Sequence, residues 1–139
     1  MSSIREYHDA DYDDLKELYG HTEWYGGVFD KARDGRERLA KKIADDPEAI
    51  WLYEEGGKVV GTVSLIDDGR VAWLYRLVVK HNDPVVTQKL YDHAAQILKK
   101  HGHEQVLVYT PVGDRTLHNR YEQLGMMRGS DYTCYWAQL

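Results

Sequence analysis

The chain has 139 residues, a formal net charge of −5 and a single cysteine. This length buries roughly 68% of the extended surface, so we expect a single domain over residues 1–139. The acidic charge argues against non-specific nucleic-acid binding, which needs a basic surface. It either favours a cationic substrate or only keeps the protein soluble. No apolar run approaches the ~20 residues that cross a bilayer, and no basic-then-apolar leader is present. We therefore expect a cytoplasmic protein with no membrane partner.

A strand and a helix are predicted at the start of the chain. Residues 4–7 form the short strand, and Asp9 or Asp11 caps the helix. The apolar residues of this helix recur at helical spacing as far as Tyr19. Residues 21–27 then interrupt the pattern and end in two glycines, which predicts a connecting loop.

A second helix and three consecutive strands follow. The helix covers residues 29–43 and stops before a proline. The strands cover residues 49–54, 58–66 and 71–80. A Gly-Gly pair and an Asp-Gly pair separate them, and both pairs are hairpin signals.

The last third of the chain predicts two more helices and two more strands. One helix carries an apolar face from residue 86 to 97, and an apolar strand at 105–109 follows it. A helix at 114–124 and a strand at 130–137 complete the pattern. The order β-α-α-β-β-β-α-β-α-β predicts an α/β fold with a mixed central sheet and helices on both faces. The strand-helix-strand unit from 71 to 109 should pair its strands in parallel.

This order resembles the GNAT superfamily of N-acetyltransferases over nearly the whole chain. Residues 121–126, Tyr-Glu-Gln-Leu-Gly-Met, are similar to the family's Tyr-Glu-Lys-x-Gly-Phe signature, and Leu77, Val78 and Val79 match the end of its fourth strand. The resemblance implies acetyl-CoA as co-substrate and an amine as acceptor. It also implies that the backbone of Leu77, Val78 and Val79 holds the pantetheine arm.

The segment after this strand departs from the family. The family usually places Arg/Gln-Gly-x-Gly-x-Gly/Ala here, so that bare N–H groups at a helix start hold the pyrophosphate. Residues 80–89 contain no glycine. Asp83 and Pro84 are typical of an N-cap and a first-turn proline, which would leave a carboxylate at the phosphate position. If the helix instead starts at Thr87, its hydroxyl and the next amides stay available. The resemblance implies cofactor contacts in this segment from Asp83, Val85, Val86, Thr87 and Gln88.

Two residues of the helix at 114–124 belong to the same expected cofactor site. Asp114 stands where the family often has an asparagine that faces the pantetheine, and it is either a cofactor contact or a plain N-cap. Leu117, on the same helix, is the other expected contact.

Acetyl transfer needs a proton donor for the leaving thiolate, and Tyr121 is the candidate. A phenol of pKa ~10 gives its proton to a thiolate of pKa ~8.5 at a cost of only ~2 kcal/mol. The alternative is a core tyrosine on the apolar face of its helix.

The general base has no obvious candidate on the strand at 71–80. The family frequently has a glutamate there, at places that Tyr75 and Arg76 hold in this chain. The substitutes are Glu23, Glu54, His81 and His21, and a chain of water molecules is a further alternative. No metal site is expected. The missing glutamate and glycines favour a second interpretation, a GNAT-like domain that has lost catalysis and serves as a binding or regulatory module.

The C-terminal strand is rich in aromatic residues. Residues 132–136, Tyr-Thr-Cys-Tyr-Trp, either pair across a homodimer or lie inside the sheet. Cys134 has no histidine near it in sequence, so we expect a packed thiol and not a nucleophile.

Overall fold

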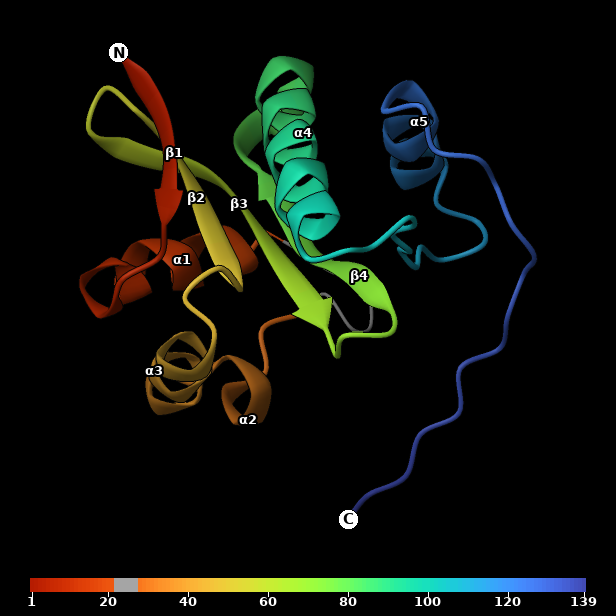
Figure 1. The fold of residues 1–139 in the computed structure, drawn as a ribbon, viewed down its shortest axis with the longest axis horizontal. Coiled ribbons are helices and arrows are strands. Elements are labelled where there is room, and N and C mark those ends of the chain that lie inside the picture. Colours follow the sequence, from red (N-terminus) through yellow and green to blue (C-terminus); the bar gives the residue numbers. More distant parts are fainter. Residues whose placement is uncertain (22–27) are drawn as a thin grey trace. The chain divides into compact units, whose positions relative to one another are not determined.

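A computed structural model describes residues 1–21 and 28–139 (Figure 1). It divides into two compact units, Met1–Val108 and Tyr109–Leu139, here the N-terminal and C-terminal units. The elements of the N-terminal unit are β1 (Ser2–Glu6), η1 (Asp9–Asp11), α1 (Tyr12–Tyr19), α2 (Lys31–Asp34), α3 (Arg36–Asp45), β2 (Ile50–Glu55), β3 (Lys58–Asp67), β4 (Ala72–Val79), η2 (Lys80–Asn82) and α4 (Pro84–Lys100). The C-terminal unit contains α5 (Arg115–Gln123). Among the described residues, no helix combines the length and apolar character that crossing a bilayer requires.

The sheet contains four strands in the order β1-β2-β3-β4, and each neighbouring pair is antiparallel. Gly56 and Gly57 join β2 to β3 with φ values of 59° and 78°. Gly69, in the next turn, has a φ of 86°. Positive φ is the conformation in which glycine has no steric penalty, so both predicted hairpins are confirmed.

Helices cover both faces of the sheet, as predicted. On one face Tyr19 of α1 places its hydroxyl 3.4 Å from that of Ser64 on β3. Gly61 lies three residues earlier on β3 and so points to the opposite face, where α4 packs against it. The core on the α1 face is made of Tyr7, Leu15, Leu18, Tyr19, Leu39, Ala49, Ile50, Leu52 and Val59.

The N-terminal helices differ in detail from the prediction. The helix expected over residues 29–43 is broken at Gly35, whose ψ of 149° is extended, and becomes α2 and α3. Asp11 is the N-cap residue of α1, but its side chain makes no capping hydrogen bond to that helix. Its carboxylate instead accepts hydrogen bonds from the His8 N–H and from Arg5.

The strand predicted at 105–109 is reduced to one bridge. Leu107 pairs in parallel with Trp73, through Leu74 N–H to Leu107 O at 2.9 Å and Leu107 N–H to Ala72 O at 3.0 Å. The parallel direction was therefore predicted correctly, whereas the length was not. The apolar run at 105–109 has the composition of a strand, but composition does not supply the neighbouring hydrogen bonds that define one.

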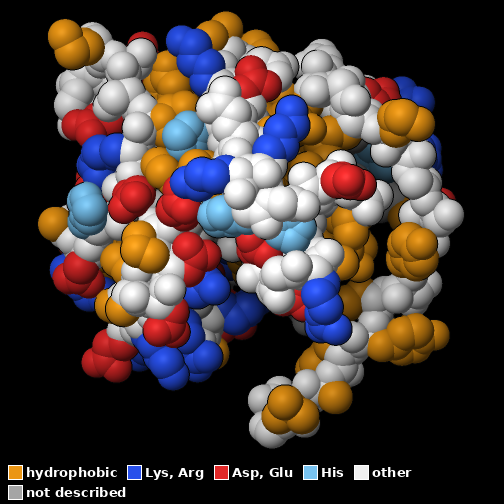
Figure 2. Space-filling view, viewed as in Figure 1, with side chains coloured by type: hydrophobic (Ala, Val, Ile, Leu, Met, Phe, Trp, Pro, Cys, Tyr) orange, Lys and Arg blue, Asp and Glu red, His pale blue; other side chains and the backbone are white. Residues whose placement is uncertain are grey.

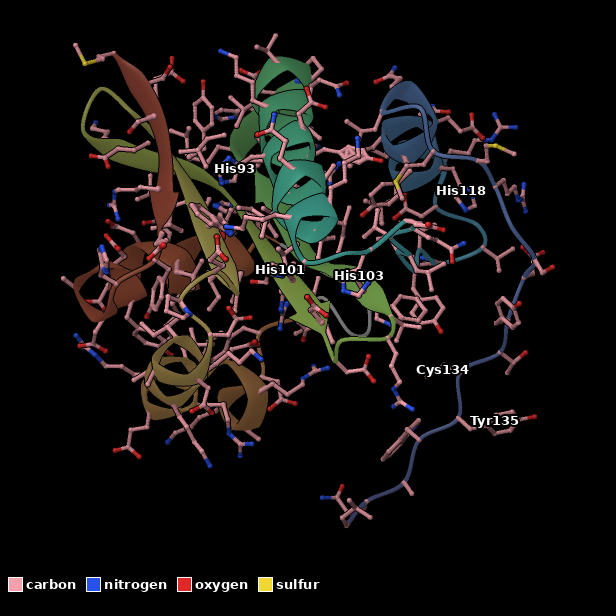
Figure 3. The ribbon with its side chains drawn as sticks, viewed as in Figure 1. His93, His101, His103, His118, Cys134 and Tyr135 are labelled. Atoms are coloured by element: carbon pink, nitrogen blue, oxygen red, sulfur yellow. The ribbon has the colours of Figure 1, made fainter. Side chains whose placement is uncertain are left out.

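The strand predicted at 130–137 is wrong for this structure. Residues 126–139 contain no helix or strand, and residues 127–139 are all exposed. Tyr135 is 91% exposed and Trp136 is 71% exposed. Hydrophobic side chains project along this segment in Figure 2. Cys134 is exposed as well (Figure 3), so the expectation of a packed thiol is also wrong. β-Propensity reports a fit to a half-buried pleated surface and does not create one.

The close approach of α4 to β3 gives a stability prediction. A Cβ added at Gly61 would lie 3.0 Å from Leu90 Cδ1 and 3.1 Å from Val86 Cγ1. Gly61→Ala should therefore lower the free energy of unfolding by about 1–3 kcal/mol through overpacking, measured by urea denaturation. Gly113→Ala is the control, because no atom lies within 4 Å of its added Cβ, and it should change stability by less than about 0.5 kcal/mol. Equal effects of the two substitutions would contradict this account of the packing.

Candidate functional site

β4 contains an irregularity in its middle. Ser64 of β3 pairs with Tyr75 and Thr62 pairs with Val78, so one residue of β3 faces two of β4. Arg76 has a φ of 57° at this point. This is a β-bulge, a device that re-aims side chains and is frequent beside active sites. Arg76 contacts Tyr19 and Tyr75 through cation–π geometry, with its guanidinium carbon 4.6 Å and 5.3 Å from the two ring centroids.

Arg76 forms an ion pair in the interior of the N-terminal unit. Its guanidinium donates to the carboxylate of Asp34 and, at 3.0 Å, to the carbonyl of Val28. The two charged side chains are 1% and 4% exposed. Asp34 also accepts a hydrogen bond from the Asp30 N–H at 2.9 Å. The pair therefore fastens the bulge of β4 to α2 and to the chain that enters α2. An arginine held in this way cannot act as the base.

The sequence predicted neither the burial of Arg76 in an ion pair nor Asp34 as its partner. An arginine within an otherwise apolar strand was the available signal, since such a charge needs a buried partner. The partner lies 42 residues away in the chain, and no local pattern identifies it.

The predicted cofactor strand alternates between the two faces. Val79 lies beside Gly61 on the α4 face, and Val78 packs against the core cluster on the α1 face. Leu77 and Val79 are buried. Their side chains therefore serve the core, so a role for Leu77, Val78 and Val79 in holding pantetheine rests on their backbone.

The turn after β4 keeps a left-handed shape without glycine. His81 has a φ of 58° and Asn82 a φ of 50°. Asn and His are among the non-glycine residues that adopt this region most readily. The chain then reverses directly into α4.

Helix α4 begins at Pro84 and is capped by Asp83, so the alternative start at Thr87 is wrong. Asp83 Oδ1 accepts from the Val85 N–H at 2.9 Å and from the Val86 N–H at 3.4 Å. The Thr87 hydroxyl donates to the Asp83 carbonyl at 2.8 Å, and so does the Thr87 N–H at 3.0 Å. Gln88 donates its side-chain amide to Asp92 at 2.8 Å. Pro84 has no N–H, so the N-terminal donors of this helix already have partners.

In the C-terminal unit, Asp114 caps α5. Its Oδ1 accepts from the Leu117 N–H at 3.0 Å, which confirms the N-cap; the cofactor contact expected of Asp114 stays a prediction. Leu117 and Tyr121 are the buried residues of α5. Burial raises the pKa of the Tyr121 phenol, although the charge of Arg120 works in the opposite direction. A raised pKa keeps the phenol protonated, as a proton donor requires.

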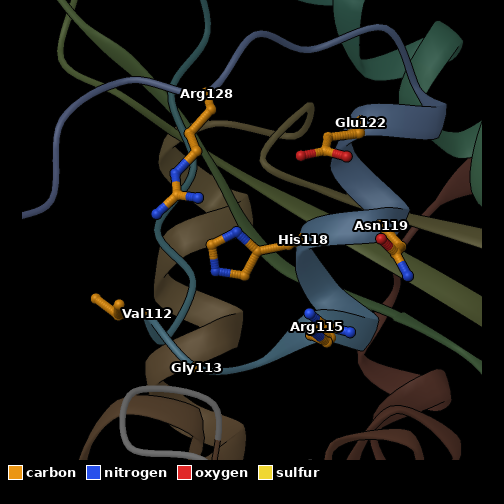
Figure 4. Close-up of a pocket in the computed structure, with 7 residues that line it drawn as sticks. All are labelled: Val112, Gly113, Arg115, His118, Asn119, Glu122 and Arg128. Carbon is orange, nitrogen blue, oxygen red and sulfur yellow. The ribbon is translucent and has the colours of Figure 1, made fainter.

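A hollow of about 380 Å³ lies on the opposite face of α5 (Figure 4). It is lined by Val112, Gly113, Arg115, His118, Asn119, Glu122 and Arg128. Residues three, four and seven apart share a helix face, which groups Arg115 with His118 and Glu122. Neither Leu117 nor Tyr121 lines the hollow.

The two candidate carboxylate bases have different outcomes. Glu54 lies on β2, two strands from β4, and its carboxylate accepts from Arg5 Nε at 2.6 Å. The role of Glu54 as the general base stays a prediction. Glu54 would have to accept the proton of the amine while it is paired with Arg5. Glu23 lies outside the described residues.

Comparison with known proteins identifies the family. The model of the acetyltransferase (GNAT) family matches residues 4–126. The chain belongs to this family. A search of curated proteins finds no significant match for this GNAT protein.

Solved structures share the fold at low sequence identity. One neighbour is AAC(6')-Iy in complex with the bisubstrate analogue CoA-S-monomethyl-acetylneamine, with a TM-score of 0.78, 14% identity and coverage of 100% of this chain and 99% of that chain. Glucosamine-6-phosphate N-acetyltransferase from Arabidopsis thaliana gives a TM-score of 0.72 at 20% identity, covering 99% of both chains. PaiA N-acetyltransferase from Thermoplasma acidophilum, in complex with coenzyme A, gives 0.72 at 18% identity, covering 88% and 87%. These likenesses confirm the α/β GNAT fold class.

The buried ion pair of Arg76 and Asp34 gives a stability prediction. Asp34→Asn should leave the Arg76 charge without its counter-charge and lower the free energy of unfolding by about 3–5 kcal/mol, measured by chemical denaturation. Asp131→Asn is the matched control, because its ion pair with Arg128 is 57% and 59% exposed; it should cost less than about 1 kcal/mol. If Asp34→Asn costs no more than the control, the pair does not hold β4 to α2.

Proposed function

We propose that this GNAT protein transfers an acetyl group from acetyl-CoA to a primary amine of a small molecule or a protein. The observation that carries the proposal is the family match over residues 4–126. The bulge of β4 supports it, because a bulged strand is frequent beside active sites. Two neighbours with the same fold are named N-acetyltransferases. One of these is in complex with coenzyme A, and a further neighbour is in complex with a CoA-based bisubstrate analogue.

The reaction forms one bond and breaks one. The neutral amine nitrogen attacks the thioester carbonyl, the C–N bond forms and the C–S bond breaks. The amine loses one proton and the CoA thiolate gains one. Tyr121 donates the proton to the thiolate and recovers one from solvent. A phenol of ordinary pKa ~10 is already protonated at pH 7, and the burial that raises the pKa of Tyr121 adds to the cost of this transfer.

The acceptor amine must be deprotonated before attack. A lysine-like amine of pKa ~10.4 costs about 4.6 kcal/mol to neutralise at pH 7. Arg76 cannot take this proton, because it is cationic and paired with Asp34. Glu23 and Glu54 are the proposed acceptors of the proton.

A second function is favoured by two specific observations. Arg76 occupies a place where the family has its glutamate, and Asp83 caps the helix start that would receive phosphate. Both fit a domain that binds a ligand without turning it over. We also propose a homodimer, a cytoplasmic location and a single domain over residues 1–139. The exposed aromatic residues Tyr132, Tyr135 and Trp136 support the homodimer.

Ligand binding can be tested by a melting scan. Acetyl-CoA at 100 times its dissociation constant should stabilise the protein by about 2.7 kcal/mol, seen as a rise in Tm. ATP at the same concentration is the control, because it carries phosphates but no pantetheine, and it should leave Tm unchanged. An unchanged Tm at millimolar acetyl-CoA would remove acetyl-CoA as the donor.

The role of Tyr121 can be tested separately. Tyr121→Phe removes the proton donor, so kcat should fall by about 10²–10⁴-fold while the Tm shift with acetyl-CoA is retained. The measurement is steady-state release of CoA thiol with an amine acceptor. Tyr135→Phe is the matched control, since this tyrosine is 91% exposed, and its kcat should equal that of the wild type. Full activity of Tyr121→Phe would exclude the phenol from the mechanism, and turnover by the wild type itself would exclude the non-catalytic alternative.

A further inference from the structure

We infer that Asp83 sets the donor specificity of this protein: it recognises an acyl thioester through the pantetheine arm and gains little from the pyrophosphate of CoA. The inference rests on the proposed function and extends its donor from acetyl-CoA to acyl-pantetheine thioesters as a class.

The N–H groups at the start of α4 already donate hydrogen bonds within the chain. A helix offers its first N–H groups to an anion only when they lack partners. Here Pro84 contributes none, and the Val85 and Val86 N–H groups donate to Asp83 Oδ1. The Asp83 N–H itself donates to the Lys80 carbonyl at 3.3 Å. A phosphate at this position would have to displace a carboxylate that belongs to the chain.

The negative charge of Asp83 also opposes phosphate binding at the start of α4. The positive end of a helix macrodipole attracts one anion, and the Asp83 carboxylate already occupies this place. A pyrophosphate brought to the same turn would meet a like charge. The capping bonds and the charge therefore act in the same direction, against phosphate binding.

Residues 80–89 also contain basic side chains. Lys89 does not offset the carboxylate, because its amino group lies 3.5 Å from the Tyr53 hydroxyl and 5.9 Å from the centroid of that ring. This places the ammonium over β2. Lys80 lies in η2, and its formal charge of +1 is equal and opposite to that of the Asp83 carboxylate.

The turn between β4 and α4 keeps its left-handed backbone shape. The left-handed residues His81 and Asn82 keep a tight reversal between β4 and α4 without glycine. Asp83 therefore changes what the helix start can bind while the β4 backbone, the proposed site of the pantetheine arm, keeps its place. The loss is specific to the phosphate end of the donor.

The test compares two donors on the full chain. The dissociation constants of acetyl-CoA and S-acetylpantetheine are measured by calorimetry for the wild type, Asp83→Asn and Asp92→Asn. In the wild type the two constants should differ by less than about tenfold. Asp83→Asn keeps an N-cap oxygen and removes the charge, so it should tighten acetyl-CoA about fivefold and leave S-acetylpantetheine unchanged. Asp92→Asn removes the same charge two turns further along α4 and should change neither.

The outcomes separate this inference from the proposed function. A wild-type preference for acetyl-CoA above about tenfold, or an Asp83→Asn variant whose acetyl-CoA affinity does not rise, overturns the inference and leaves the acetyltransferase proposal standing. Binding of S-acetylpantetheine alone supports the inference in its strongest form. Failure of both thioesters to bind the folded wild type at millimolar concentration removes the proposed function, and the inference with it.

Discussion

Arg76 carries a full positive charge into the interior of the N-terminal unit, where its side chain is only 1% exposed. Burying an unpaired charge is prohibitively costly, so Asp34 must remain beside it. The bulge of β4 gives Arg76 the orientation that this pair needs, because it places Tyr75 and Arg76 on one face of the sheet together with Tyr19. The strand proposed to hold pantetheine, the short helix α2 and the chain that enters α2 are thus joined by one electrostatic contact.

This contact also shapes the chemistry. The family's usual glutamate on this strand would accept a proton from the acceptor amine, whereas this chain places there an arginine already committed to Asp34. An enzyme built this way must pass the amine proton to another group, for which Glu23 and Glu54 are the proposed candidates. Glu54 itself is paired with Arg5, as Asp34 is with Arg76.

The start of α4 illustrates how one residue can preserve a fold and alter its ligand. Asp83 stabilises the helix through the two N–H groups that would otherwise receive an anion. The same bonds that fix the helix start therefore close it to phosphate. Turn shape and donor availability are separate properties, and this chain retains the first while it loses the second.

The class of fold, the two hairpins, the capped start of α5 and the family can be inferred from the sequence alone, whereas for α4 the sequence allows a start at Pro84 or at Thr87 and the structure has the start at Pro84. These features follow from local rules of periodicity, glycine conformation and capping, or from a motif of consecutive residues such as 121–126. Only the tertiary structure decided that Arg76 pairs with Asp34 across 42 residues, that Gly35 divides a predicted helix, and that residues 130–137 lack a strand partner within the described chain. A buried charge and a β-ladder are satisfied by groups far away in the chain, and no local pattern records which group that is. The break at Gly35 is different, because the atom that a Cβ would meet there is the carbonyl oxygen of Lys31, four residues earlier, at 2.6 Å.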